Sequence, residues 1–273
     1  MKKNFISRLI IFFPLIFFVL LVCVAVPPRL DETAESKSPW QTEAQFIGLP
    51  AFSPGDQIIT HAAYTLKYNE KCEQAEWVAY KLVYAELKDL KRAGKFRVDP
   101  AVKTGSAAPE DYSKSGYDKG HLAPAADMKY SVLIISESFF MSNISPQKPE
   151  FNRGIWKCLE EHVRAWAEQN KELYIVTAGI LKGDLSVIGK KNRVGVPLFF
   201  YKVILDYKEP ELKAIAFIVP NEGSDENLQS FAVTIDQVEE ATGIDFFPAL
   251  PDNIEEILES AIDLSKWEFK KCQ

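Results

Sequence analysis

Short apolar segments separated by turn residues predict most of the secondary structure beyond residue 57. Runs of this kind that are rich in Ile, Val, Tyr, Thr and Leu are typical of β-strands. They predict strands at 58–60, 64–66, 76–82, 173–179, 194–205 and 214–219, with 194–205 interrupted at Pro197. Residues 236–242 and 254–264 have amphipathic helical patterns, and Gly243 ends the first of these helices. Because strands and helices do not alternate regularly, the pattern predicts an α+β fold with a central mixed or antiparallel sheet.

A further helix is predicted from Asn152 to Glu168. On one continuous helix, Asn152, Trp156 and Glu160 occupy positions i, i+4 and i+8 and share a slowly drifting face. Glu160 then lies about 12 Å further along the axis, at 1.5 Å per residue. Its side chain leans back toward the N-terminus of the helix, so we expect it to approach Asn152. Trp156 is expected to belong to the core.

The N-terminus carries a long apolar run from Leu9 to Val26, preceded by Lys2, Lys3 and Arg8. Eighteen apolar residues are just enough to span a bilayer. The basic flank predicts that the N-terminus stays in the cytoplasm and that the rest of the chain is exported. Residues 1–26 are thus a signal anchor or a cleaved signal peptide. The first alternative predicts a protein anchored in the inner membrane and facing the periplasm, and the second a periplasmic or secreted protein.

Residues 27–54 are predicted to be a linker, because they are rich in proline and contain a polar tract that cannot form a core. One folded domain is expected over residues 55–268. A chain of 273 residues with 47% hydrophobic residues has enough apolar material for a sizeable core in such a domain.

Two polar blocks near the middle of the chain carry the candidate chemistry. The first is Asp118-Lys119-Gly120-His121. The second comprises Ser142-Asn143-Ile144-Ser145-Pro146-Gln147 and, further on, Asn152, Trp156 and Glu160. An imidazole can take a proton from water, and an amide oxygen is a hard donor that suits Mg²⁺. Together with a neighbouring cation, these groups suit phosphodiester hydrolysis.

The two blocks resemble the signature of the DNA/RNA non-specific endonucleases, the ββα-metal nucleases of the endonuclease G and Serratia type. The first block of the family is Asp-Arg-Gly-His, and this chain has Lys119 in place of the arginine. The second block of the family is Ser-Asn-x-x-Pro-Gln, which residues 142–147 match. The resemblance implies a ββα-metal (His-Me finger) fold. Lysine keeps the positive charge of the family's arginine but loses its two-pronged geometry, which puts the strength of phosphate binding in question.

The resemblance also implies roles for individual residues. His121 would be the general base, and Asn152 the direct ligand of one divalent metal ion, Mg²⁺ or Mn²⁺. Glu160 would act on this metal through a bound water molecule.

Arg164 matches an arginine that the family uses near the phosphate, although an ordinary helix pair with Glu160 is equally consistent with the spacing. Asn143 is expected to support the histidine or the metal, and a turn-forming asparagine is the alternative. Lys119 is expected to contact phosphate.

The charged residues are unevenly distributed along the chain, and this changes what the net charge implies for nucleic-acid binding. The net charge is −6, which at first opposes nucleic-acid binding. Residues 221–263, however, contain twelve acidic residues and no Lys or Arg, so the remainder of the chain is net positive. A local basic groove is therefore compatible with the composition.

The four cysteines are Cys23, Cys72, Cys158 and Cys272. Cys23 lies in the apolar run. Export permits a disulfide between two of the other three, and the sequence does not select the pair.

These observations predict a metal-dependent endonuclease that hydrolyses both DNA and RNA. One alternative is a phosphodiesterase or pyrophosphatase of the same fold that acts on small substrates. Another is a non-catalytic nucleic-acid-binding module. The combination of His121, Asn152 and Glu160 argues against the second alternative, because binding alone needs no general base.

Overall fold

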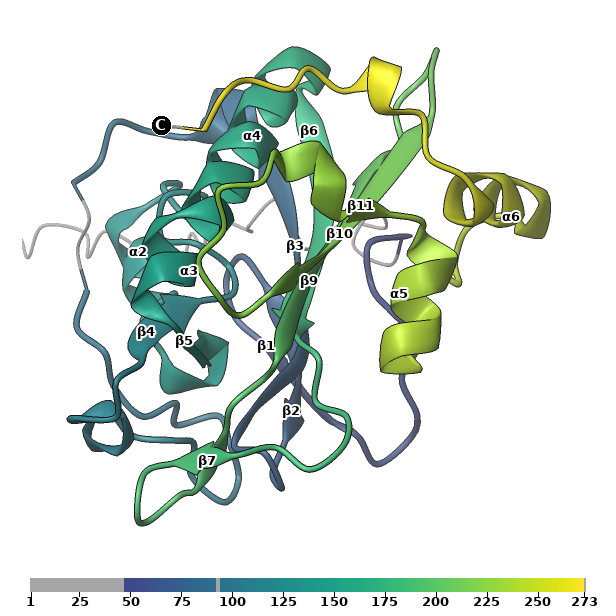
Figure 1. Ribbon diagram of the computed structural model, residues 1–273. Coiled ribbons are helices and arrows are strands. Elements are labelled where there is room, and N and C mark those ends of the chain that lie inside the picture. The colour runs from purple at the N-terminus through teal and green to yellow at the C-terminus, as the bar shows by residue number, and fades with distance from the viewer. Residues whose placement is uncertain (1–46, 92–93, 273) are drawn as a thin grey trace, which may run out of the picture. The chain divides into compact units, whose positions relative to one another are not determined.

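A seven-stranded sheet organises the part of the chain that the computed structural model describes, residues 47–91 and 94–272 (Figure 1). Its strand order is β1-β2-β3-β6-β9-β10-β11, and all neighbouring strands are antiparallel. The strands are β1 (Gln57–Thr60), β2 (Thr65–Asn69), β3 (Gln74–Val83), β6 (Glu172–Gly179), β9 (Phe199–Asp206), β10 (Lys213–Pro220) and β11 (Ala232–Val233). The predicted α+β class is confirmed, and the sheet is antiparallel.

Two small hairpins lie outside this sheet. One pairs β4 (Asp118–His121) with β5 (Ile144–Gln147), and the other pairs β7 (Val187–Ile188) with β8 (Val194–Gly195). The strand predicted over 194–205 is divided into β8 and β9. The division falls at Pro197, which has no N–H group to donate to a ladder.

The α-helices lie on both faces of the sheet (Figure 1). They are α2 (Val132–Glu137), α3 (Pro149–Arg153), α4 (Ile155–Asn170), α5 (Ile235–Thr242) and α6 (Asp252–Ser260). Figure 1 shows α4 and the β4–β5 hairpin on one face and α5 and α6 on the other. The buried face of α4 contributes two fully buried tryptophans, Trp156 and Trp166, which contact Phe200 and Phe217 of the sheet.

The connection between β3 and β6 carries most of the candidate chemistry. These two strands are neighbours in the sheet, with Val78 opposite Thr177 and Val83 opposite Glu172. Residues 84–171, which lie between them in the sequence, include β4, β5, α2, α3 and α4. The two polar blocks therefore lie on one long connection that leaves the sheet after β3 and returns to it at β6.

The end of the predicted linker packs onto this domain. Leu49 is buried, and the N–H of Ala51 donates a hydrogen bond to the carbonyl of Asp245 at 2.8 Å. The ordered domain thus includes residues 47–54, because an apolar side chain and a backbone hydrogen bond hold them. The rest of the predicted linker and the apolar run of residues 9–26 lie outside the described residues. Within 47–91 and 94–272, no helix has the length and apolar character needed to cross a membrane.

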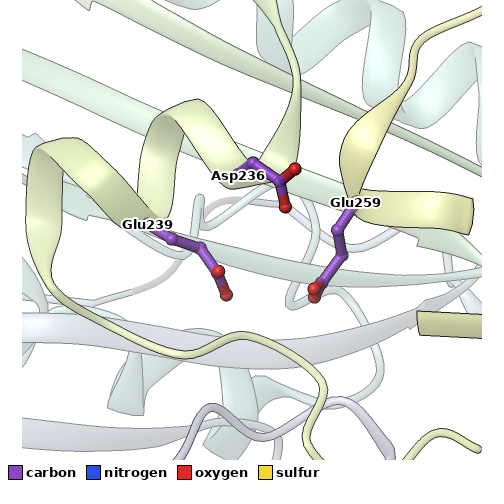
Figure 2. Close-up of side chains that lie close together, drawn as sticks. All are labelled: Asp236, Glu239 and Glu259. Carbon is purple, nitrogen blue, oxygen red and sulfur yellow. The ribbon is translucent and has the colours of Figure 1, made fainter. Parts of the chain in front are cut away.

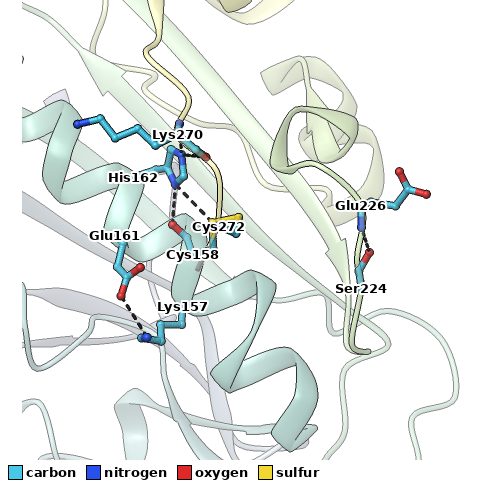
Figure 3. The surroundings of a disulfide bond; sticks show 8 residues. All are labelled: Lys157, Cys158, Glu161, His162, Ser224, Glu226, Lys270 and Cys272. Atoms are coloured by element: carbon cyan, nitrogen blue, oxygen red, sulfur yellow. Dashed lines mark hydrogen bonds and ion pairs between the residues drawn. A yellow bond between two sulfur atoms is a disulfide. The ribbon is translucent and has the colours of Figure 1, made fainter.

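A disulfide joins Cys158 of α4 to Cys272 near the C-terminus (Figure 3). The Cα atoms are 5.5 Å apart, although the residues are separated by 114 positions in the sequence. His162, one turn further along α4, donates from Nδ1 to the Cys158 carbonyl at 2.8 Å and accepts at Nε2 from the Lys270 N–H at 2.9 Å. The disulfide and the hydrogen bond from the Lys270 N–H thus attach the C-terminal segment to α4. Cys72 is a free, half-buried cysteine.

Replacing Cys272 by serine should lower the free energy of unfolding by about 2–4 kcal/mol, because the bond closes a long loop in the unfolded chain. Chemical denaturation with and without reductant measures the change. Cys72→Ser is the matched control and should change stability little. Equal stability of the oxidised wild type and Cys272→Ser would show that the bond contributes nothing.

Candidate active site

The β4–β5 hairpin presents Lys119 and His121 on the same side of a strand. They are two residues apart in β4, and side chains at that spacing share a face. In the register, Lys119 lies opposite Pro146 and His121 opposite Ile144. Gly120 separates them because a Cβ atom there would lie 2.1 Å from the side chain of Gln147. The glycine of the first block is thus required by the close approach of β5.

A cavity of about 440 Å³ opens beside this hairpin. Four of the six predicted site residues line it, namely Lys119, His121, Asn152 and Glu160. The remaining wall is built from Asp89, Leu90, Lys91, Pro124, Ala125, Ala126 and Lys129. Three lysines against two carboxylates make the lining basic, despite the acidic total of the chain. Another cavity of similar size, about 460 Å³, lies between residues near Ala51 and Thr242 and contains none of the predicted residues.

The His121 ring lies among aromatic side chains. The edge-on contact with Phe139 has a centroid distance of 4.9 Å, and Phe96 lies at 5.5 Å. The ammonium of Lys119 lies 5.6 Å from the centroid of the same Phe96 ring. These uncharged rings contact the imidazole and lie close to the Lys119 ammonium, so they limit the movement of both side chains without forming ion pairs with them.

Asn152 is oriented by Asp118. Its Nδ2 donates to Asp118 Oδ2 at 2.9 Å, and the guanidinium of Arg153 donates to both carboxylate oxygens at 2.8 and 2.7 Å. Burial alone would raise the pKa of Asp118, but these hydrogen bonds and the charge of Arg153 lower it below its usual value. Asp118 therefore stays ionised and holds the Asn152 amide nitrogen, which leaves the amide oxygen as the donor atom for a cation.

The predicted continuous helix from Asn152 is wrong. Asn152 belongs to α3, which ends at Arg153, and α4 begins at Ile155. Gly154 lies between them, where a Cβ atom would approach the Glu150 carbonyl oxygen to 2.4 Å. Asn152 and Glu160 thus meet at one cavity through a break between two helices and not along one helical face.

Asn143 does not line the cavity. It is fully buried; its Oδ1 accepts from the Ala123 N–H, and its Nδ2 donates to the carbonyls of Ala123 and Ser138, each at 2.9 Å. The prediction of a supporting residue fits this position better than a catalytic assignment. These bonds fix the backbone two residues after His121. The role predicted for Asn143, support of the histidine or the metal, stays a prediction.

Arg164 also lies behind the cavity wall. Its Nη1 donates to Asp127 Oδ1 at 2.8 Å, and Tyr80 donates its hydroxyl to the other oxygen of Asp127 at 2.7 Å. Asp127 is fully buried. Arg164 thus pairs with this buried carboxylate and also interacts electrostatically with Glu160. The predicted phosphate contact stays a prediction.

Lys202 of β9 is a buried cation near Glu160 that the sequence motifs did not indicate. It is fully buried, and its ammonium lies 4.8 Å from the centroid of the Trp156 ring. Burial raises the pKa of Glu160 and the charge of Lys202 opposes this effect, whereas burial lowers the pKa of Lys202. A single lysine inside the apolar run Phe199–Asp206 was the available signal, since lysine is almost never buried without a partner.

Replacing Lys202 by methionine should shift the acidic side of the pH–activity profile to higher pH. The lysine charge lowers the pKa of Glu160, so its removal raises that pKa and protonates the carboxylate earlier as the pH falls. We expect a loss on the order of tenfold at the acid end and a smaller loss at the optimum. Rates measured across pH test this. Lys213→Met, on the adjacent strand and paired with Asp206, is the control that should leave the acidic side of the profile in place.

The model of the DNA/RNA non-specific endonuclease family matches residues 47–253. The chain belongs to the DNA/RNA non-specific endonuclease family. The predicted resemblance is therefore confirmed, and the matched region begins at the residue where the described domain begins.

Several relatives of known name share this region. The chain is 36% identical over 221 residues to the zebrafish mitochondrial nuclease EXOG, covering 75% of this chain and 64% of that protein. It is 33% identical over 225 residues to a nuclease of a Nostoc species, covering 77% and 80%. It is 32% identical over 216 residues to human mitochondrial endonuclease G, covering 74% and 72%.

A solved structure has the same fold. A chain in the crystal structure of the EndoG/EndoGI complex superposes with a TM-score of 0.70 at 28% sequence identity, covering 76% of this chain and 92% of that one. The predicted ββα-metal fold is thus confirmed. In this member of the non-specific endonuclease family, the ββα unit consists of β4, β5 and the two-part helix α3–α4.

The donor atoms at the cavity fit a hard divalent cation. Asn152 offers a neutral amide oxygen and Glu160 a carboxylate, and oxygen donors are those that Mg²⁺ and Mn²⁺ prefer. With so few protein ligands, the ion would retain several water molecules, as Mg²⁺ commonly does. A bound cation would also favour the ionised form of Glu160, opposite to the effect of burial.

Proposed function

We propose that this protein is a divalent-metal-dependent endonuclease that hydrolyses phosphodiester bonds of both DNA and RNA. The observation that carries the proposal is the convergence of His121, Asn152 and Glu160 on one basic cavity. A proton acceptor, a cation site and positive charge are the groups that hydrolysis of a phosphodiester requires. A module that only binds nucleic acid has no need for the first two.

The residues that line the cavity have separate roles in the proposed reaction. Lys119, Lys91 and Lys129 attract the phosphate backbone, which DNA and RNA share. His121 accepts a proton from the attacking water, and Phe139 and Phe96 hold its ring. Asn152 would bind the cation directly and Glu160 would act on it through a bound water molecule. The cation would be Mg²⁺, with Mn²⁺ as a substitute, and when bound it would supply positive charge for the oxygen that leaves.

Purified protein from residue 45 to the C-terminus, incubated with plasmid DNA and with a structured RNA, tests the proposal. Both polymers should be cut internally in Mg²⁺ or Mn²⁺ and left intact in EDTA. Hydrolysis of small phosphodiesters with neither polymer cut would favour the alternative of a small-substrate enzyme. Cleavage of only one polymer would contradict the absence of sugar specificity.

We further propose that the folded domain works outside the cytoplasm, either anchored to a membrane or released. The apolar run of residues 9–26 with its basic flank motivates this, and the Cys158–Cys272 bond supports it, because disulfides persist in oxidising compartments.

When the full chain is produced in a Gram-negative host, protease added to spheroplasts should digest the nuclease domain. The reason is that an exported domain is exposed once the outer membrane is removed. Immunoblots of treated and untreated spheroplasts give the measurement, and a cytoplasmic marker protein is the control. Complete protection, together with recovery in the soluble cytoplasmic fraction, would exclude export.

A further inference from the structure

A cluster of three carboxylates lies on the opposite face of the sheet from the active-site hairpin. Asp236 and Glu239 project from α5, and Glu259 projects from α6 (Figure 2). One carboxylate oxygen from each residue lies within 4.8 Å of the others. The cluster is thus formed by two helices that are distant from the β4–β5 hairpin in the sequence, and none of its residues lines the active-site cavity.

Glu259 is the member whose environment points to a ligand. Only 7% of the residue is exposed, and Figure 2 shows its carboxylate directed toward Asp236 and Glu239. Its buried Oε1 atom has no hydrogen-bond partner within residues 47–91 and 94–272. A buried polar oxygen without a partner costs free energy, so native proteins rarely leave one unless an ion or water completes it.

Among the residues that the structure describes, no positively charged side chain pairs with the cluster. Residues 221–263, which contain both helices, have no Lys or Arg. None of the ion pairs found among the described residues includes a member of the cluster. Lys182, which reaches α5, donates to the backbone carbonyl of Glu240. Burial, followed by the neighbouring acidic side chains of Glu239 and Glu255, raises the pKa of Glu259 to about 8.

We propose that Asp236, Glu239 and Glu259 bind a calcium ion. Ca²⁺ binds carboxylate oxygens at about 2.4 Å, so two oxygens bound to one ion can lie up to about 4.8 Å apart. It also accepts irregular sets of six to eight oxygens, which suits a site whose members range from exposed to buried. Water completes the coordination on the exposed side at Asp236.

The ion joins α6 to α5. Glu239 is already held on one side, because its Oε1 accepts from the Phe246 N–H at 2.7 Å. A cation shared with Glu259 extends this attachment to the last α-helix. Binding to the folded state alone stabilises it by mass action, so the site makes the stability of the protein depend on calcium without contributing to catalysis.

The test uses the Asn152→Ala protein, in which the proposed catalytic cation site is disabled. Calorimetric titration with CaCl₂ should show one binding event, and millimolar CaCl₂ should raise the melting temperature by several degrees above its value in EDTA. Glu259→Gln in the same background should abolish both effects. Glu256→Gln, an exposed glutamate on the same helix, is the matched control and should retain both.

Three results would overturn the proposal. One is the absence of a calcium-dependent heat and melting shift in the Asn152→Ala protein. Another is an undiminished shift in Glu259→Gln, or in Asp236→Asn should the buried variant not fold. The third is an equal shift with MgCl₂ at the same concentration, which would identify a general counter-ion effect. Because the measurements report binding and melting, their failure does not bear on nuclease activity.

Discussion

Replacing His121 by alanine should reduce the turnover of DNA by on the order of 10²–10⁴-fold, the usual contribution of a general base. His121 is the only histidine of the described residues that lines the basic cavity. Aromatic contacts with Phe139 and Phe96 hold its ring there. The measurement is the initial rate of plasmid cleavage in saturating Mg²⁺, compared with the wild type. Binding of a labelled duplex in EDTA should be nearly unchanged, since the lysines of the cavity remain.

His61→Gln is the matched histidine control. His61 lies away from the cavity and contacts the Asp99 carboxylate at 2.9 Å. Its replacement should affect stability while leaving the turnover of the folded protein close to that of the wild type. If His121→Ala retains a rate within about threefold of the wild type, the imidazole is not the proton acceptor.

Asn152→Ala should reduce turnover by on the order of 10²-fold or more, because the charge stabilisation supplied by a bound cation is worth several kcal/mol. Glu160→Ala removes the carboxylate from the same cavity and should act on the same cation. The two losses should therefore fail to add in the double variant. Asn152→Asp adds a negative charge that weakens the pull of the cation on phosphate, so its activity should also fall, though less than that of the alanine variant.

Turnover as a function of metal concentration, measured for the wild type, the two alanine variants and their combination, provides the test. Glu161→Gln is the control for Glu160, because its exposed side chain pairs with Lys157 on the surface of α4. It should behave like the wild type. Strictly additive losses, or full activity in EDTA, would contradict a shared cation site.

The parts of the fold that the sequence predicted are those determined by local pattern. Unbroken apolar runs identified β6 and β10, because a strand buried in the centre of a sheet needs apolar side chains on both faces. The resemblance to the motifs of the non-specific endonucleases identified Lys119, His121, Asn152 and Glu160, and all four line one cavity.

The parts that could not be predicted depend on partners distant in the sequence. For Arg164 the resemblance predicted a phosphate contact and the spacing a pair with Glu160, and neither revealed its buried partner Asp127. The pairing of Cys158 with Cys272 depends on a path that passes through four strands of the sheet, β6, β9, β10 and β11. Periodicity does not reveal the break at Gly154, where a Cβ atom would meet the Glu150 carbonyl oxygen, since the apolar pattern continues across it.

The candidate catalytic residues lie in the connection between β3 and β6, and this position affects when the protein becomes active during folding. Those strands are neighbours in the sheet, so their pairing closes the entire segment 84–171, and closing a long loop is entropically costly. Contacts of such wide sequence separation form slowly. His121 lies on the hairpin and Glu160 on α4, which packs across both strands, so a chain with an unclosed sheet has no complete site. A newly made chain whose sheet has not yet closed would then be harmless to the nucleic acids of the cell that makes it.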